Sequence, residues 1–342
     1  MKRVSLFLLL SIYSLPSCSS QGDPKSILDL FDQIDLLQGE VLSHDIFIGR
    51  PAQLHITGSF LFFLDFYQDR FMTVVNLLTG ETKRVLRMGR GPNELISPIR
   101  ITQLINDSIL NIYETFSSSS IQFNVKDILE KSDPPIIKRT RFAQDGSIRP
   151  VQEADRFYIG TGLRLEQMFA IFDKSGQKTH EYIPYPKEAE QFEIRPRSIA
   201  YQFDFKISPD GTKLVQAGFY FDLLCFYRVD PDHITEHKRY FFNDAHVVEN
   251  RDKTGVDILP NTKMYYTSLY PTRDRVYALY GEGYGGKNKT YYLLCFDWDG
   301  NPLKAYKFDR SLFSICVNEA GTELFVLAME NGEGLIVRYK LS

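Results

Sequence analysis

The sequence predicts an all-β protein, a six-bladed β-propeller of four-stranded antiparallel blades closed by an N-terminal strand. Three observations carry this prediction. The chain has 26 Phe and 20 Tyr against one Trp, and both residues favour half-buried strands. Beyond residue 40 the helical period of the apolar residues nearly vanishes, and short β-type runs alternate with turn signals. Two types of hairpin also recur along the chain.

The first hairpin type is an apolar strand, a turn and a second strand. It occurs at 74–86, 170–183 and 293–308, and in a variant with Asp-Pro-Asp at the turn at 223–242. The second type is a strand, a turn ending in Gly-Thr and a strand. It occurs at 205–218 and 315–328, and with weaker turns at 151–162 and 269–281. One hairpin of each type gives the four strands of a propeller blade.

We therefore expect a propeller domain over residues 41–342. Its blades should cover roughly 51–94, 95–142, 146–186, 196–244, 262–309 and 310–342. The sixth blade is one strand short, and the run Val41–Ile48 is free to complete it. Such closure of the ring removes exposed strand edges. A pair of β-sandwiches is the alternative architecture, but it leaves the recurrence of two hairpin types unexplained.

The N-terminus has the layout of a secretory signal. Lys2 and Arg3 precede the apolar run Val4–Leu15, which is too short to span a bilayer, and Cys18 follows after small residues. This arrangement resembles the lipobox of bacterial lipoproteins. The resemblance implies that residues 1–17 are a lipoprotein signal peptide and that the lipid on Cys18 anchors the chain to a membrane. An ordinary signal peptide with an incidental Cys is the alternative.

The sequence after Cys18 indicates a tether over residues 18–40. Polar and helix-breaking residues come first, and Ser26 is placed to cap a short helix through Leu37. Ser19 and Ser20 offer no acidic signal for retention at the inner membrane. We therefore expect a lipid-anchored protein of the bacterial cell envelope, held at the outer membrane, and we leave open which face it occupies.

Charge and cysteine content narrow the function classes. The formal net charge is −3 and no long basic run occurs, so a nucleic acid is not an expected partner. Cys225, Cys295 and Cys316 each lie in an apolar run, which predicts buried thiols. Cys225 and Cys295 hold the same place in successive blades, in two Leu-Leu-Cys-Phe runs, and equivalent positions lie too far apart for a disulfide.

The run MGRGPNEL at 88–95 differs from the other turns. It follows a strand with a Gly-bearing turn, and this combination resembles the TolB-like six-bladed propeller lipoproteins of Bacteroidetes. The run SPDGTKL at 208–214 is similar to the turn repeat of TolB-type propellers. The resemblance implies a six-bladed propeller and an envelope location, and it implies no established reaction.

Two interpretations of the 88–95 run stay open. Gly89 and Gly91 permit positive φ, and Glu94 is placed to accept hydrogen bonds from backbone amides freed by the turn. The run is then a structural clasp between the first two blades. In the second interpretation Arg90, Asn93 and Glu94 form part of a ligand mouth.

Other candidate site residues lie at the predicted starts of innermost strands. These are Arg100, Arg149, Arg197 and Tyr201. Three arginines converging on the mouth of the channel would favour an anionic small ligand such as a carboxylate or an acidic sugar. The alternative is that they are solvated loop charges.

No metal or cofactor is expected. His233 and His237 have helical metal spacing in a segment that reads as a strand, and the Gly-rich run 281–286 precedes a strand rather than a helix. We therefore expect a non-catalytic propeller that binds a ligand or an envelope protein. The alternative is a metal-dependent propeller hydrolase or lyase of the NHL or lactonase kind.

Overall fold

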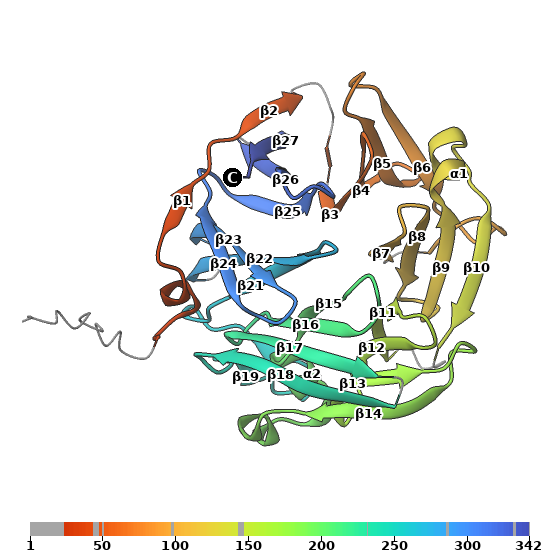
Figure 1. The fold of residues 1–342 in the computed structure, drawn as a ribbon. Coiled ribbons are helices and arrows are strands. Elements are labelled where there is room, and N and C mark those ends of the chain that lie inside the picture. Colours follow the sequence, from red (N-terminus) through yellow and green to blue (C-terminus); the bar gives the residue numbers. More distant parts are fainter. Residues whose placement is uncertain are drawn as a thin grey trace, which may run out of the picture.

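The strands form a ring of six sheets around a central axis (Figure 1), as predicted. This computed structural model describes residues 24–43, 48–49, 51–96, 99–142, 147–230, 232–284, 287–330 and 333–341. The predicted signal peptide and Cys18 lie outside the described residues. None of the helices described is long and apolar enough to cross a membrane.

The first three blades follow the chain in order. Blade one contains β3 (Pro51–Thr57), β4 (Phe60–Tyr67), β5 (Arg70–Asn76) and β6 (Thr82–Arg87). Blade two contains β7 (Ile99–Ile105), β8 (Ile109–Glu114), β9 (Ser119–Asn124) and β10 (Ile136–Arg141), with α1 (Val125–Glu130) before β10. Blade three contains β11 (Ile148–Glu153), β12 (Tyr158–Gly162), β13 (Gln167–Phe172) and β14 (Lys178–Pro184).

The last three blades carry longer connections. Blade four contains β15 (Phe203–Ile207), β16 (Lys213–Gly218), β17 (Leu223–Asp230) and β18 (His233–Phe241). Blade five contains β21 (Tyr266–Pro271), β22 (Arg275–Tyr284), β23 (Lys287–Asp297) and β24 (Pro302–Lys307), and blade six contains β25 (Leu312–Val317), β26 (Glu323–Glu330) and β27 (Glu333–Lys340). The 3-10 helix η2 (Lys187–Gln191) and α2 (Ile194–Ala200) precede blade four, and the hairpin of β19 (Val248–Glu249) and β20 (Val256–Asp257) follows it.

An N-terminal strand closes the ring, as predicted. β2 (Glu40–Ser43) pairs antiparallel with β27 and gives blade six its fourth strand. The chain just before it differs from the expected tether and helix. The 3-10 helix η1 (Ile27–Leu30) ends seven residues before Leu37, and β1 (Ile34–Leu36) then pairs parallel with β24 as a fifth strand of blade five.

Tertiary packing explains this difference. Ser26 and Asp29 form a capping box at the start of η1, and Ile27 is fully buried. Phe31 then packs edge-on against Phe296 of blade five, with ring centroids 5.5 Å apart. The free edge of β24 offers unpaired backbone groups to the chain that follows, and pairing there outweighs continuation of a short helix.

The three described cysteines are buried free thiols, as predicted. Cys225 lies on β17 and Cys295 on β23, the third strands of successive blades. Burial raises the pKa of Cys225 to about 12 and that of Cys295 to about 11. These thiols therefore serve as core residues.

Polar side chains join the innermost strands of neighbouring blades. The Gln53 Oε1 atom accepts a 2.8 Å hydrogen bond from the backbone N–H of Ile101, which links blade one to blade two. Gln103 both donates to the backbone carbonyl of Glu153 and accepts from its N–H, at 3.1 and 3.0 Å, which links blades two and three. Such pairing satisfies strand edges that would otherwise be buried without partners.

The same device recurs at three more seams. Gln152 of blade three accepts from Ile207 N–H of blade four at 3.0 Å, and Asp204 of blade four accepts from Leu269 N–H of blade five at 2.9 Å. Ser314 Oγ of blade six accepts a hydrogen bond from the backbone N–H of Leu54 of blade one, at 2.9 Å. In every case the side chain belongs to the preceding blade, so these bonds repeat around the ring.

The topology gives the ring two distinct faces. The innermost strands surround the centre (Figure 1), and each is the first strand of its antiparallel blade. They are β3, β7, β11, β15, β21 and β25. We call the face where they begin the strand-start face; it carries the crossovers between blades and the loops between second and third strands. The strand-end face carries the turns between first and second and between third and fourth strands.

Candidate functional site

Bulges interrupt most of the innermost strands. The pairing of β3, β7, β11, β21 and β25 with the second strand of the same blade shifts register in each case. In β11 the shift lies between Ile148 and Val151, so Arg149 is within the bulge. Bulges redirect side chains and are common beside functional sites.

Three arginines lie at or near strand starts in this part of the ring: Arg100 at the start of β7, Arg149 at the start of β11 and Arg195 on α2, the helix that precedes blade four. Arg100 is exposed on β7 and Arg149 is half-buried on β11, and these two strands are in contact. Burial lowers the pKa of Arg149, and the positive charges of Arg100 and Arg195 lower it further. None of the three takes part in the ion pairs found between described residues.

Arg195 takes the place that the sequence assigned to Arg197. Arg197 lies on α2 rather than at a strand start, because residues 187–200 form η2 and α2 and β15 begins only at Phe203. Its Nη2 atom is 3.2 Å from Glu166 Oε2, and its guanidinium lies over the ring of Tyr185. Arg195, on the same helix, is the one whose charge reaches Arg149.

Tyr201 is also not at a strand start. It is the C-cap of α2, its ring is buried, and its hydroxyl donates a 2.7 Å hydrogen bond to Asp244 Oδ1. Burial and the Asp244 carboxylate raise the pKa of Tyr201 well above its usual value. The structure therefore places the Tyr201 ring in the core, packed against Tyr185, Phe192 and Phe221.

The loop after β6 is closed on itself by backbone and side-chain bonds. Gly91 N–H donates to Glu94 Oε2 at 2.7 Å, the amide contact expected from the sequence. Gly89 N–H donates to the carbonyl of Leu95 at 2.9 Å. A Cβ on Gly89 would lie 2.0 Å from Glu94 Oε2, so the carboxylate occupies the space that only glycine leaves free.

Asn93 faces away from the rest of the loop. Its Oδ1 atom accepts a 3.3 Å hydrogen bond from the N–H of Ile136 on β10, so it ties this loop to the outer strand of blade two. The loop therefore does act as a clasp between the first two blades. Arg90 and Glu94, in contrast, line an open hollow beside it.

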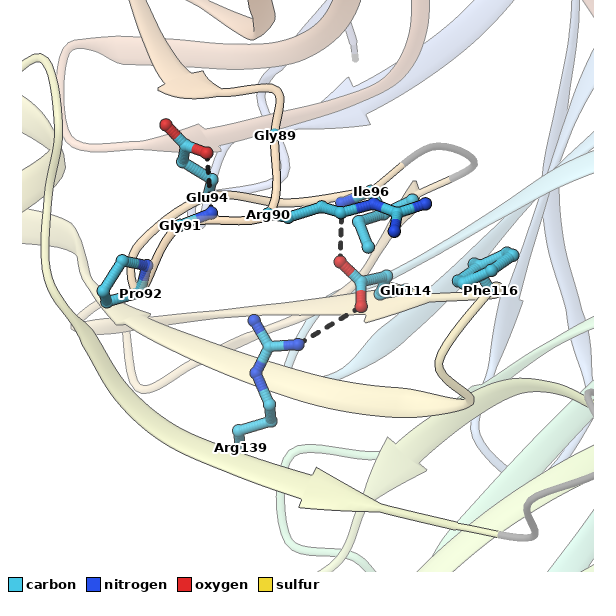
Figure 2. A pocket seen from close by; sticks show the side chains of 9 residues that line it. All are labelled: Gly89, Arg90, Gly91, Pro92, Glu94, Ile96, Glu114, Phe116 and Arg139. Atoms are coloured by element: carbon cyan, nitrogen blue, oxygen red, sulfur yellow. Dashed lines mark hydrogen bonds and ion pairs between the residues drawn. The ribbon is translucent and has the colours of Figure 1, made fainter.

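The hollow has a volume of about 390 Å³ and is shared by blades one and two (Figure 2). Its lining residues are Gly89, Arg90, Gly91, Pro92, Glu94, Ile96, Glu114, Phe116 and Arg139. Two loops that are distant in sequence build it: the one after β6 and the one between β8 and β9. Arg139 on β10 completes it.

A buried carboxylate organises one wall of this hollow. The side chain of Glu114 is 1% exposed. Its Oε1 accepts from Ile96 N–H at 2.7 Å, and its Oε2 lies 3.2 Å from Arg139 Nη1 and accepts from Ser117 Oγ. Phe116, two residues further along the chain, is 66% exposed. This grouping could not be predicted from the sequence, because no local pattern joins the two loops.

The fold agrees with a known family. A model described as TolB-like 6-blade propeller-like matches residues 30–320. This chain belongs to the TolB-like six-bladed propeller family. No curated protein matches the sequence.

Solved structures share the fold of this TolB-like propeller at low sequence identity. A "putative exported protein" of Bacteroides fragilis NCTC 9343 has 12% identity and a TM-score of 0.52, with 89% of this chain and 94% of that chain covered. A luciferin-regenerating enzyme has 8% identity and a TM-score of 0.52, with 89% and 95% covered. At these identities the likeness extends to the fold alone.

The histidines considered for metal binding lie on β18 of the TolB-like propeller. His237 Nε2 is 3.9 Å from Asp299 Oδ1, and His233 packs edge-on against Tyr182. Among the described residues, no three His, Cys, Asp or Glu side chains gather in a way that could hold a metal ion. The described part of the Gly-rich run, residues 281–284, is the end of β22, and β23 pairs antiparallel with that strand, which matches the strand expected after the run.

Proposed function

We propose that this chain is an envelope-tethered, non-catalytic propeller that binds an anionic small ligand at the strand-start face. The observation that carries the proposal is the group of Arg100, Arg149 and Arg195. A half-buried cation flanked by two like charges is unfavourable on its own, and Arg149 has no carboxylate partner among the described side chains. A carboxylate ligand would supply the missing counter-charge.

The chemistry of arginine suits this role. A guanidinium binds a carboxylate through two parallel N–H···O bonds, and such charge-assisted bonds are stronger than neutral ones. Arg100 and Arg149 come from the innermost strands of neighbouring blades, and Arg195 comes from the crossover into the next blade. A ligand at this position would contact three blades held rigid by the seam hydrogen bonds.

A thermal-shift screen of di- and tricarboxylates tests this proposal. Citrate should raise the melting temperature of the wild type, because a ligand that binds only the folded state stabilises it. The variant carrying Arg100→Gln, Arg149→Gln and Arg195→Gln should lose this shift, and Arg228→Gln on the opposite face should retain it. An equal shift in the triple variant would contradict the proposal.

The tether is the second part of the proposal. The lipobox-like sequence at Cys18 supports acylation, which would hold the ring at the outer membrane, within reach of an envelope protein partner. The Bacteroides fragilis neighbour is also described as exported. Labelling of the native host with an alkyne fatty acid should tag the wild-type protein and leave Cys18→Ala untagged. A tagged Cys18→Ala variant would contradict acylation at this residue.

The metal-dependent hydrolase or lyase remains a separate prediction that no observation in the described residues favours. Metal analysis of the purified protein tests it directly: a stoichiometric divalent ion would support the enzyme alternative.

A further inference from the structure

The hollow and the arginine group are neighbours on the strand-start face. Glu114, in the wall of the hollow, is the last residue of β8 and pairs with Ile99 of β7. Arg100 is the next residue along β7 and pairs with Tyr113. Successive side chains of a strand point to opposite faces of the sheet, so Arg100 lies on the face of blade two opposite to Glu114. A ligand in the hollow therefore reaches the arginines only by passing over the start of β7.

Phe116 gives the hollow an exposed aromatic surface. At 66% exposure it is the most exposed of the described phenylalanines. It lies in the loop between β8 and β9, and Figure 2 shows its ring at one side of the hollow, with the Arg90 side chain extending toward that side. An aromatic ring left open to solvent favours a partner with an apolar face.

The polar groups of the hollow differ in how fully they are used. Glu114 is saturated by Ile96, Ser117 and Arg139. Glu94, in contrast, uses Oε2 for Gly91 N–H, and its Oε1 makes no hydrogen bond with another described residue. Arg90 is exposed and forms no ion pair within the described part of the chain. The hollow thus has the Arg90 cation and the Phe116 ring on one side and the Glu94 carboxylate on the other side of the loop (Figure 2).

We propose that the hollow binds an acidic saccharide. The apolar C–H face of one sugar ring would stack on Phe116, the carboxylate of that ring would pair with Arg90, and a hydroxyl of the adjoining ring would donate to Glu94. A simple aliphatic carboxylate lacks the apolar ring face, and an aromatic acid lacks hydroxyl donors for Glu94. This inference rests on the proposed function and names its ligand class, with the next charged ring at Arg100 and Arg149.

Calorimetric titration with trigalacturonic acid, citrate and neutral maltotriose tests the inference. Trigalacturonic acid should bind the wild type more tightly than citrate, and maltotriose should not bind detectably. Phe116→Ser and Arg90→Gln should each weaken trigalacturonic acid binding about tenfold and leave citrate binding unchanged. Phe241→Ser, which removes an exposed phenylalanine from the outer strand of blade four, should stay within about twofold of the wild type.

The outcomes separate this inference from the proposed function. If Arg149→Gln abolishes binding of both anions while Phe116→Ser changes neither, the saccharide site is overturned and the anion site stands. If Arg149→Gln changes neither affinity, the proposed function fails. Wild-type protein that binds citrate and not trigalacturonic acid also overturns the saccharide site. Both Phe116 and Arg90 are exposed, so circular dichroism should show these variants folded like the wild type.

Discussion

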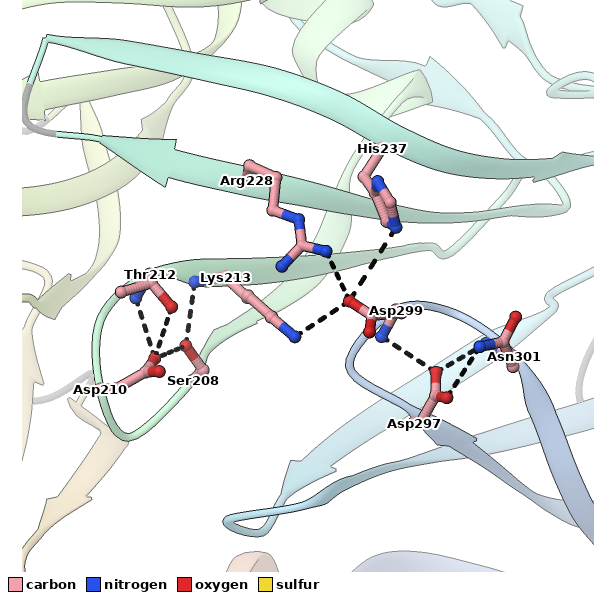
Figure 3. A network of polar contacts seen from close by, with 9 residues as sticks. All are labelled: Ser208, Asp210, Thr212, Lys213, Arg228, His237, Asp297, Asp299 and Asn301. Carbon is pink, nitrogen blue, oxygen red and sulfur yellow. Dashed lines mark hydrogen bonds and ion pairs between the residues drawn. The ribbon is translucent and has the colours of Figure 1, made fainter.

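On the strand-end face, Asp299 of blade five gathers cations from blade four (Figure 3). Its Oδ1 atom lies 2.9 Å from Lys213 Nζ, 2.7 Å from Arg228 Nη2 and 3.9 Å from His237 Nε2. On the strand-start face, Arg100, Arg149 and Arg195 lie within reach of one another's charge and share no such carboxylate among the described residues. The cations around Asp299 are therefore neutralised, whereas Arg100, Arg149 and Arg195 form no ion pair with the described residues.

The difference extends to the turns. On the strand-end face, Asp210 accepts from the N–H and the hydroxyl of Thr212, and Asp297 accepts from the N–H groups of Asp299 and Asn301. These are local bonds that fix hairpin geometry. On the strand-start face polar groups join the crossovers between blades, and the three arginines there form no ion pair with the described residues. This contrast supports the proposal of an anion site on the strand-start face.

The largest expected effect on stability comes from removing Glu114 on the strand-start face, compared with removing Asp299 on the strand-end face. Glu114→Ala should lower the free energy of unfolding by about 3 kcal/mol, since it leaves Arg139 unpaired and the Ile96 amide without its acceptor. Asp299→Ala should cost about 1 kcal/mol, because its side chain is 45% exposed and water screens the ion pairs. Urea denaturation measures both, and a greater loss for Asp299→Ala would break the comparison.

The two faces should also respond oppositely to pH. Burial raises the pKa of Asp222, in the strand-start loop between β16 and β17, to about 6. The folded state therefore keeps the proton that the unfolded state releases near pH 3.8, so stability falls as pH rises through this window. We expect a loss of about 3 kcal/mol of folding stability from this group.

Asp222→Asn mimics the protonated group and should remove this loss. Urea denaturation of both proteins between roughly pH 3.5 and pH 7, which spans the unfolded and folded pKa values of this carboxyl, measures how the free energy of unfolding changes with pH. An unchanged slope in Asp222→Asn would mean that another group is responsible.

On the strand-end face the pH dependence of stability has the opposite sign. The hydrogen bond from Lys213 lowers the pKa of Asp299; at Asp210, burial opposes ionisation, but bonds from Ser208 and Thr212 outweigh it and lower the pKa. Their contribution is present above the unfolded pKa and is lost as pH falls through the lowered folded value. Asp210→Asn should therefore flatten the fall in stability below about pH 4. A fall of the same steepness would contradict this assignment.

The smallest expected effect sharpens the comparison at two glycines. Gly89→Ala should cost about 1 kcal/mol of stability, because the new Cβ displaces the Glu94 carboxylate from Gly91, and it should weaken trigalacturonic acid binding a few-fold. Gly211→Ala, at a positive φ of 72° on the strand-end face, should cost a similar amount and leave binding unchanged. Equal affinity of both variants for trigalacturonic acid would show that Glu94 does not contribute to the site.

The architecture was open to prediction because each blade repeats the same two hairpins. The closing strand β2, the buried thiols and the bond between Glu94 and the Gly91 amide followed from local patterns. Strand β1 did not, since a three-residue strand carries no signal until the edge of β24 is present beside it.

The site was less predictable for a related reason. The strand-start positions of Arg100 and Arg149 could be predicted from the hairpin order, and β7 and β11, which carry them, are in contact. Helix α2 is too short to show a helical period, so Arg197 was assigned to a strand and Arg195 was missed. The hollow joins two loops that are apart in sequence, and the inter-blade bonds of Gln103 and Gln152 depend on the closed ring. Neither can be inferred from neighbouring residues.

Calorimetric titration of citrate into Arg149→Gln and Arg228→Gln tests the contrast between the faces most directly. Each variant removes one guanidinium, the first from the strand-start face and the second from the strand-end face. The proposed anion site predicts at least about tenfold weaker binding for Arg149→Gln and no more than about a twofold change for Arg228→Gln. Equal affinities for the two variants would contradict it.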